Sequence, residues 1–316
     1  MVLQITRLAP SPTGALHLGN ARTFLISWLL ARQQGWKIVL RIEDIDGPRI
    51  KRNADRELID VVKWLGIDWD EGPIYQSNRR DAYAAALDQL IRNGFVYPCT
   101  CTRKEIELAA SAPHAEDGAT IYPGTCRGRY ASIETAAKES WRSPALRFEV
   151  TSEAAEFDDV FGGHQAYDPP SQLGDFVVAK ADGTPAYQLA VVVDDAAAHV
   201  TQVIRGDDLI DSTPRQMLIY RALGQTEQIP TYTHLPLVVG TDGRRLAKRH
   251  GDTRLSMYRN SGVSAGRLLS LLARWCGMNA ASESLRAADL IDSFRLGDVS
   301  KSPIVFTDAD HSELLG

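Results

Sequence analysis

The chain has 316 residues, of which 44% are hydrophobic, and it carries a formal net charge of -5 with a pI near 5.8. This length and apolar content are enough for a full hydrophobic core, and they predict two domains or one domain with a large insertion. We find no apolar run of membrane-spanning length and no cationic leader with a cleavage site, so we expect a cytoplasmic protein without a membrane anchor. The acidic balance argues against a generally basic nucleic-acid binder, although a local patch is enough to hold phosphates.

Strand and helix patterns alternate from the start of the chain. Residues 2–8 alternate as a short strand, apolar residues then recur at helical spacing from 18 to 29, and residues 39–43 form a second strand. Two amphipathic helices are expected over residues 53–65 and 79–93. Such alternation predicts an α/β fold with a doubly wound, Rossmann-type parallel sheet and crossover helices.

The character of the chain changes after residue 96. Cysteines, prolines and polar runs with isolated strands predict an insertion over residues 97–175, between a first half of the catalytic domain (1–96) and a second half (176–255). In that second half we expect strands over residues 176–180, 187–195 and 200–208. Residues 256–316 are expected to form a short helical C-terminal part, with a helix over 265–276 and then a polar tail.

The loop between the first strand and the first helix is suited to hold phosphate. Pro10, Pro12 and Gly14 prevent any regular element there, so the loop ends at a helix N-terminus. Unpaired amides and the positive end of the helix dipole favour an anion at that point, and His17 and Asn20 add polar side chains. A glycine-containing turn before a helix also occurs for purely structural reasons.

Charged residues lie at three of the expected strand ends, where open α/β sheets place their ligands. These are Arg7, Glu43 and Arg205. One carboxylate and two arginines suit a substrate with one ammonium and two carboxylates, because arginine binds planar carboxylates bidentately. Glutamate fits this description, although each residue taken singly is also typical of a surface ion pair.

Three of the four cysteines occur close together in the sequence. Cys99, Cys101 and Cys126 lie in two tight turns, whereas Cys276 lies in an apolar helical segment and is expected to belong to the core. Three thiols could bind zinc, with His114 or Tyr122 as fourth ligand and histidine the default from general chemistry. The alternative is that these cysteines are small buried apolar residues.

Residues 11–20, Ser-Pro-Thr-Gly-Ala-Leu-His-Leu-Gly-Asn, resemble the His-Ile-Gly-His signature of class I aminoacyl-tRNA synthetases in the form that glutamyl enzymes carry. Residues 245–251, Arg-Leu-Ala-Lys-Arg-His-Gly, resemble the second signature, Lys-Met-Ser-Lys-Arg-His-Gly, with Arg245 in place of the first lysine and Lys248 retained. A cationic loop facing a phosphate-binding helix end suits adenylate formation, because it stabilises the charge that builds up when a carboxylate attacks the α-phosphorus. A solvated cationic face is the other interpretation of this cluster.

The resemblance covers about residues 1–255 and implies roles for individual residues. It implies His17 and Lys248 as catalytic residues and a glutamate pocket of Arg7, Ser11, Glu43, Tyr187 and Arg205. The implied ATP site consists of Pro10, Thr13, Gly14, His17, Gly19, Asn20, Asp207, Leu246 and Lys248, with Mg²⁺ on the phosphates. It also points to Tyr122 rather than His114 as the partner of Cys99, Cys101 and Cys126 in one structural zinc site.

Within the family, the chain is most similar to the short paralogues that glutamylate the queuosine base in the anticodon loop of tRNA(Asp). Its length, its C-x-C with Tyr-x-x-x-Cys, and Val191 in place of the usual asparagine favour this branch. We therefore expect a monomeric ligase that uses ATP, L-glutamate and queuosine-containing tRNA(Asp). The alternatives are a truncated glutamyl-tRNA synthetase that charges the 3′ end, and a non-catalytic glutamate or nucleotide sensor.

Overall fold

The computed structural model describes residues 3–12, 16–45, 53–109, 121–151, 155–246, 252–280 and 282–316, without the side chains of residues 107–109. The chain divides into two compact units. Unit 1 comprises residues 1–77, 200–209 and 230–316, and unit 2 comprises residues 78–199 and 210–229. The segments 78–96, 176–199 and 210–229, which we expected in the catalytic domain, thus group with the residues of the insertion.

Unit 1 is built on a five-stranded parallel sheet with the order β10-β9-β1-β2-β3. Its strands are β1 (Ile5–Leu8), β2 (Lys37–Ile42), β3 (Glu71–Tyr75), β9 (Gln202–Gly206) and β10 (Thr231–Leu235). The strands proceed from β1 to β3 on one side, whereas β9 and β10 lie on the other side of β1. This confirms the doubly wound sheet and places the topological switch point between β1 and β9.

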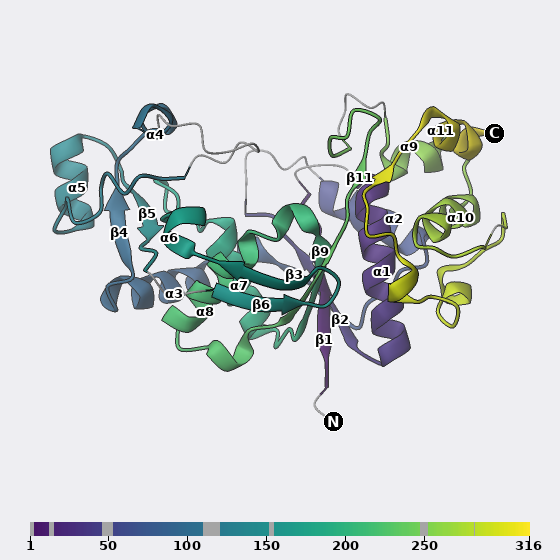
Figure 1. The fold of residues 1–316 in the computed structure, drawn as a ribbon, viewed down its shortest axis with the longest axis horizontal. Helices are drawn as coiled ribbons and strands as arrows, with labels where there is room; N and C mark the ends of the chain where they lie inside the picture. Colours follow the sequence, from purple (N-terminus) through teal and green to yellow (C-terminus); the bar gives the residue numbers. More distant parts are fainter. Residues whose placement is uncertain are drawn as a thin grey trace. The chain divides into compact units, whose positions relative to one another are not determined.

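Helix α1 (Leu18–Gln34) follows β1, and its residues Leu25, Ile26 and Leu29 are fully buried. It ends at Gly35, whose φ of 67° is left-handed and so favours glycine. Helix α2 (Ala54–Trp64) connects β2 to β3 and matches the predicted helix over residues 53–65. Both helices belong to the Rossmann-type unit (Figure 1).

The C-terminal part of unit 1 is more ordered than a polar tail. It contains α9 (Leu255–Asn260), α10 (Ala265–Trp275), the 3-10 turns η6 (Ala287–Leu290) and η7 (Leu296–Asp298), β12 (Ile304–Val305) and α11 (Asp308–Leu315). Strand β12 pairs in parallel with β11 (Val238–Val239), and α10 packs beside α1 (Figure 1). Two of the apolar residues here, Phe294 and Leu314, are fully buried.

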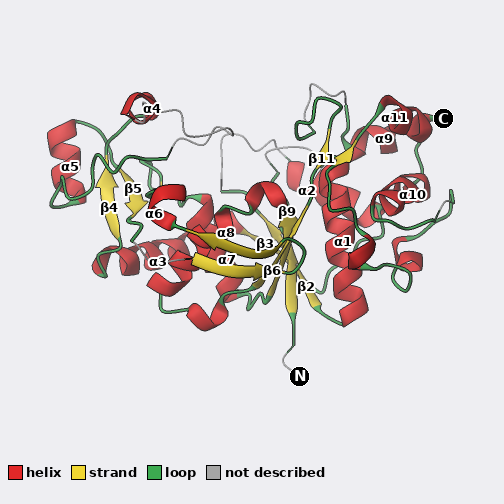
Figure 2. Ribbon diagram, viewed as in Figure 1, coloured by secondary structure: helices red, strands yellow, loops and turns green. Residues whose placement is uncertain are grey.

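Unit 2 contains a three-stranded antiparallel sheet, β4-β5-β8, and a separate hairpin, β6-β7 (Figure 2). The strands are β4 (Val96–Cys99), β5 (Ala145–Phe148), β6 (Ala155–Asp159), β7 (Gly163–Tyr167) and β8 (Phe176–Ala179). The helices of unit 2 are α3 (Arg80–Arg92), α4 (Arg103–Ala109), α5 (Ile133–Ser140), α6 (Pro169–Gln172), α7 (Tyr187–Ala197) and α8 (Ser212–Ala222). The chain also contains the 3-10 turns η2 (Gln76–Arg79), η3 (Asp207–Leu209) and η4 (Thr226–Gln228).

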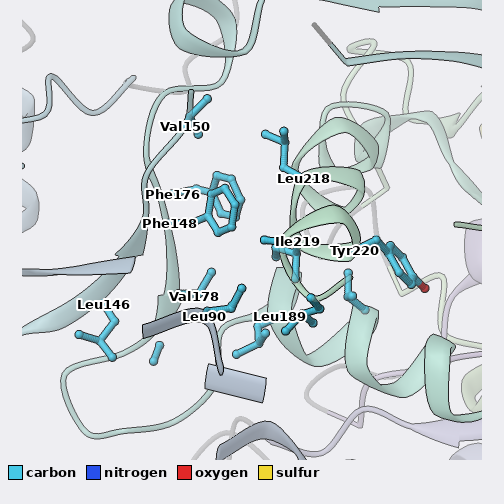
Figure 3. Packing of buried hydrophobic residues seen from close by; sticks show 14 of the residues in the cluster. Leu90, Leu146, Phe148, Val150, Phe176, Val178, Leu189, Leu218, Ile219 and Tyr220 are labelled. Carbon is cyan, nitrogen blue, oxygen red and sulfur yellow. The ribbon is translucent and has the colours of Figure 1, made fainter. Parts of the chain in front are cut away.

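The core of unit 2 lies between this sheet and helices α7 and α8. Phe148 and Phe176 stack with ring centroids 5.2 Å apart, and Leu189 of α7 and Ile219 of α8 are fully buried in the same cluster (Figure 3). Burying a side chain of this size contributes about 1.5–3 kcal/mol to stability.

Two predicted strands differ in the structure. Residues 187–195 form a helix, α7, so the strand prediction there is wrong. The run of valines in this segment suggested a strand. In the structure, residues on several faces of α7 are buried. In such a helix the apolar residues do not recur with the helical period, so the sequence pattern does not identify it. Residues 176–179 are a strand as predicted, but they pair antiparallel with β5 and not within the parallel sheet.

None of the described helices is long and apolar enough to cross a membrane.

Candidate functional site

The candidate phosphate site lies where the loop after β1 meets α1. His17 is the N-cap of α1, and its Nδ1 accepts a hydrogen bond from the Gly19 N–H at 3.1 Å. The Asn20 Oδ1 accepts from the His17 N–H at 3.2 Å, which completes a capping box. The side chains of His17 and Asn20 therefore fix the first turn of the helix as well as lining it.

The protonation state of His17 follows from this geometry. Burial, with a smaller contribution from the nearby charge of Arg245, lowers the pKa of His17 to about 4. The ring is thus neutral at physiological pH, and since Nδ1 is an acceptor the proton resides on Nε2. A Cβ at Gly19 would lie 3.1 Å from Nδ1 and Cε1 of His17, so any larger residue there would disturb the imidazole.

Three other predicted ATP-site residues, Pro10, Asp207 and Leu246, also lie in unit 1. The Pro10 carbonyl accepts from the Glu43 N–H at 3.0 Å, which ties the loop to the end of β2. Leu246 is buried and donates its N–H to Val238 at 3.3 Å, and Asp207 begins η3 after β9. Burial and the neighbouring Asp208 raise the pKa of Asp207. Thr13, Gly14 and Lys248 lie outside the described residues, as does His114.

The segments that flank the lysine loop are both anchored within unit 1. Before the loop, Arg245 pairs with Val239 as an isolated bridge, and its Nη1 lies 2.5 Å from Oδ2 of Asp208. After the loop, the Thr253 carbonyl accepts from the Leu18 N–H at 3.2 Å, in the first turn of α1. The residues that follow the lysine loop therefore contact the first turn of α1.

Three of the five predicted glutamate-binding residues lie at one edge of the parallel sheet. Arg7, Glu43 and Arg205 come from the ends of the neighbouring strands β1, β2 and β9. Arg7 and Arg205 are both buried, and the Arg7 Nη1 donates to the Ile204 carbonyl at 3.2 Å. The structure thus brings together two cations and one carboxylate beside the loop after β1.

Neighbouring side chains orient these charges. The Glu43 Oε1 accepts from Arg41 Nη2 at 3.0 Å, and Arg205 donates from Nε to His234 Nε2 at 3.0 Å. Arg205 also lies over the ring of Tyr232, 5.4 Å from its centroid. Sequence reasoning did not find His234, whose signal is only its position in a strand that pairs with β9.

The other two residues of the predicted glutamate pocket, Ser11 and Tyr187, are exposed, whereas Arg7 and Arg205 are buried. Ser11 is exposed in the loop after β1. Tyr187 is the first residue of α7 in unit 2 and is 38% exposed, and Val191 is buried in the same helix. Within unit 2, Asp194 of α7 accepts from Arg79 Nε at 2.6 Å and from the Tyr83 hydroxyl at 3.0 Å, which fixes the helix to α3.

The candidate metal centre lies in unit 2, and the structure brings all four of its predicted ligands together. The three thiol sulfurs of Cys99, Cys101 and Cys126 lie within 4.8 Å of one another. The Tyr122 hydroxyl lies 3.4 Å from the Cys99 sulfur and 3.6 Å from the Cys101 sulfur, and it accepts from the Cys126 N–H at 2.8 Å. The thiols of Cys101 and Cys126 are 3.5 Å apart.

These distances fit a tetrahedral ion. Ligands at a Zn–S distance of about 2.3 Å stand about 3.8 Å apart in a tetrahedron, so the observed spacings need only small movements to hold zinc. Burial raises the pKa of Cys101, whereas hydrogen bonds with Thr100 and Tyr122 outweigh burial and lower that of Cys126 to about 7. Cys276 lies apart from this cluster, fully buried in unit 1 as expected.

The fold and the two signature motifs define a class of protein, and comparison with known proteins agrees. Residues 4–311 match the family described as tRNA synthetases class I (E and Q), catalytic domain. The chain belongs to this family. The chain is therefore a ligase, an aminoacyl-tRNA synthetase of the glutamate and glutamine type.

Similar proteins include two named glutamyl-Q tRNA(Asp) synthetase. That of Symbiobacterium thermophilum is 46% identical and covers 94% of each chain, and that of Rhodopirellula baltica is 46% identical over 96% of this chain and 97% of the relative. A glutamate–tRNA ligase of Geobacter sulfurreducens is 40% identical over 95% of this chain and 63% of its own length. Among solved structures, a glutamate tRNA ligase of Elizabethkingia meningosepticum in complex with its amino acid has a TM-score of 0.79 at 27% identity, covering 97% of this chain and 68% of that one.

Proposed function

We propose that this chain activates L-glutamate with ATP and transfers the glutamyl group to the queuosine base of tRNA(Asp). The observation that carries this proposal is the 46% identity, over nearly the whole of both chains, to proteins named for that reaction. The buried charges at the ends of β1, β2 and β9 support glutamate as the amino acid.

In the proposed adenylation site, the phosphates of ATP lie at the N-terminus of α1. The positive end of the helix dipole attracts them, and Mg²⁺ binds the same phosphates. His17 donates from Nε2, and Lys248 stabilises the charge that forms on the phosphoryl oxygens. The other proposed ATP contacts are Pro10, Thr13, Gly14, Gly19, Asn20, Asp207 and Leu246.

In the proposed glutamate site, Arg7 and Arg205 bind carboxylates and Glu43 binds the α-amino group. Ser11 and Tyr187 complete this set. Holding the substrate carboxylate beside the α-phosphorus makes its attack effectively intramolecular, which lowers the entropic cost of the reaction. The hydrogen bonds from Arg41 to Glu43 and from Arg205 to His234 support the required orientations.

We further propose that Cys99, Cys101, Tyr122 and Cys126 hold one structural Zn²⁺. Four protein ligands leave no open position for a substrate, so the ion stabilises the fold of unit 2 and takes no part in the reaction. The proposed partners of this cytoplasmic, monomeric enzyme are ATP, L-glutamate and tRNA(Asp) that carries queuosine.

Two assays test the function. ATP–pyrophosphate exchange that depends on L-glutamate measures activation, and its absence would favour a non-catalytic sensor. Transfer of radiolabelled glutamate to tRNA(Asp) is then compared between queuosine-containing and queuosine-free tRNA. We expect label only with queuosine, and in the anticodon loop. Label at the 3′ end, independent of queuosine, would instead identify a glutamyl-tRNA synthetase.

A further inference from the structure

Arg147 in the middle strand of the antiparallel sheet of unit 2 is a buried cation. It lies on β5 between Tyr97 of β4 and Val177 of β8, and it is 8% exposed. Its Nη1 donates to the backbone carbonyl of Asp175 at 2.8 Å, and its Nε is buried without an acceptor among the described residues. Burying a guanidinium in this way is costly unless a negative charge compensates it.

The carboxylate of Asp175 is engaged elsewhere. It accepts from the Tyr97 hydroxyl at 2.5 Å, from Arg127 Nε at 3.0 Å and from the Val150 N–H at 2.8 Å. Within the part of the chain that the structure describes, Arg147 forms no ion pair. The charge that compensates Arg147 must therefore come from another source.

The guanidinium of Arg147 also lies against the ring face of Tyr122. The Arg147 Cζ lies 3.8 Å from the centroid of the Tyr122 ring, within the range of a cation–π contact. The hydroxyl of the same ring points to the thiols of Cys99 and Cys101. Arg147 is thus separated from the candidate metal centre by a single side chain.

The thiolate cluster of an occupied metal site would supply the missing negative charge. Cysteine binds zinc as thiolate, so three thiolates around one divalent cation leave a net negative charge in a buried place. A cation stacked on the fourth ligand balances that charge and fixes the plane of the ring. Groups beyond the ligands that act in this way typically change metal affinity by about 10- to 100-fold.

We infer that Arg147 is a positioning residue of the metal site, which orients Tyr122 through its ring face and compensates the charge of the thiolate cluster. This inference rests on the proposed metal site. It does not depend on the proposed reaction, because neither Arg147 nor its partners belong to the adenylation residues.

The test measures zinc affinity of the full chain by competition with a chelating dye, using zinc alone as the probe. Arg147→Met removes the charge and keeps the length of the side chain, and we expect it to weaken zinc binding by about 10- to 100-fold. Arg147→Lys keeps the charge without the planar stack, so its loss should be smaller. Arg129→Met is the matched control, since Arg129 lies 5.0 Å over the ring of Tyr130, which is no ligand.

A double-mutant cycle separates this role from a general loss of structure. If Arg147 acts through Tyr122, Arg147→Met should change zinc affinity little in a Tyr122→Phe background. Cobalt substitution gives a second readout, because the ligand-field bands report the coordination geometry and should change in Arg147→Met but not in Arg129→Met. Equal losses in both backgrounds, or wild-type affinity in Arg147→Met, would overturn the inference.

The same measurements distinguish failure of the proposed metal site from failure of the proposed reaction. A wild-type chain that binds no zinc would overturn the metal site and the role of Arg147 together, whatever the outcome of the exchange assay. Normal zinc binding without glutamate activation would overturn the reaction and leave the role of Arg147 standing.

Discussion

The backbones of His17 and Arg254 pair as an isolated antiparallel bridge in unit 1. The N-cap of α1 is therefore joined to the segment that follows the lysine loop, through hydrogen bonds from Leu18 to Thr253 and from Leu255 to Leu16. Because this contact joins the first signature motif to the residues that follow the lysine loop, we expect a change on either side to affect the other.

The first prediction separates the two tasks of His17. Asparagine is also a good N-cap, so His17→Asn should retain the cap and change the free energy of unfolding by less than about 0.5 kcal/mol. It removes the Nε2 donor, and loss of one donor to a transition-state oxyanion typically lowers the rate by about a hundredfold or more. Thermal unfolding and ATP–pyrophosphate exchange measure the two effects. Normal exchange in this variant would contradict the proposed role.

The lowered pKa of His17 also predicts a dependence of stability on pH. The pKa is about 4 in the folded chain and about 6.5 when unfolded, so the unfolded state binds more protons between these values. The contribution of His17 to stability is thus fully present above about pH 6.5 and is lost as the pH falls toward 4. Denaturant unfolding across this range should show a smaller slope for His17→Asn than for the wild type.

Arg245 is predicted to influence His17 without stabilising the fold greatly. Its ion pair with Asp208 is half exposed and is worth less than about 1 kcal/mol. Since the charge of Arg245 lowers the pKa of His17, Arg245→Ala should raise that pKa, as followed by NMR. It should remain below its ordinary value because burial is the larger cause. Arg244→Ala is the control, and an equal shift there would contradict the prediction.

The sequence predicted which charged residues lie together at one edge of the sheet, but it did not predict all of the neighbours and elements around them. Arg7, Glu43 and Arg205 were predictable because residues at the carboxyl ends of parallel strands meet at one edge. His234 was not, because no strand was expected over residues 231–235, and the pairing of β10 with β9 sets His234 directly opposite Arg205. The helix α7 was mistaken for a strand because an element buried on several faces loses the period that distinguishes the two.

His234 provides a further prediction for glutamate binding. Its Nε2 accepts from the buried Arg205, so His234→Phe leaves a guanidinium N–H without this acceptor, at a cost of about 1–3 kcal/mol. We expect the KM for glutamate to rise about tenfold or more, with a smaller effect on the KM for ATP. His234→Gln restores an acceptor and should recover part of the loss. Equal effects of both variants on both substrates would point to general destabilisation.

The last prediction concerns the C-terminal segment. The Ile304 and Phe306 N–H groups donate to Leu237 and Val239 at 2.9 and 2.8 Å, so β12 completes the strand that leads into the lysine loop. The His311 ring contacts Phe306 edge-on and hydrogen-bonds the Tyr258 hydroxyl at 2.8 Å, which ties α11 to α9.

Removal of residues 303–316 should therefore lower the melting temperature, because it exposes the partners of two buried side chains, Phe306 and Leu314. It should also lower pyrophosphate exchange more than His311→Asn does, since the point variant keeps β12. Leu315→Ser changes an exposed side chain of the same helix and is the control. If the truncated chain melts and exchanges like the wild type, β12 does not support the lysine loop.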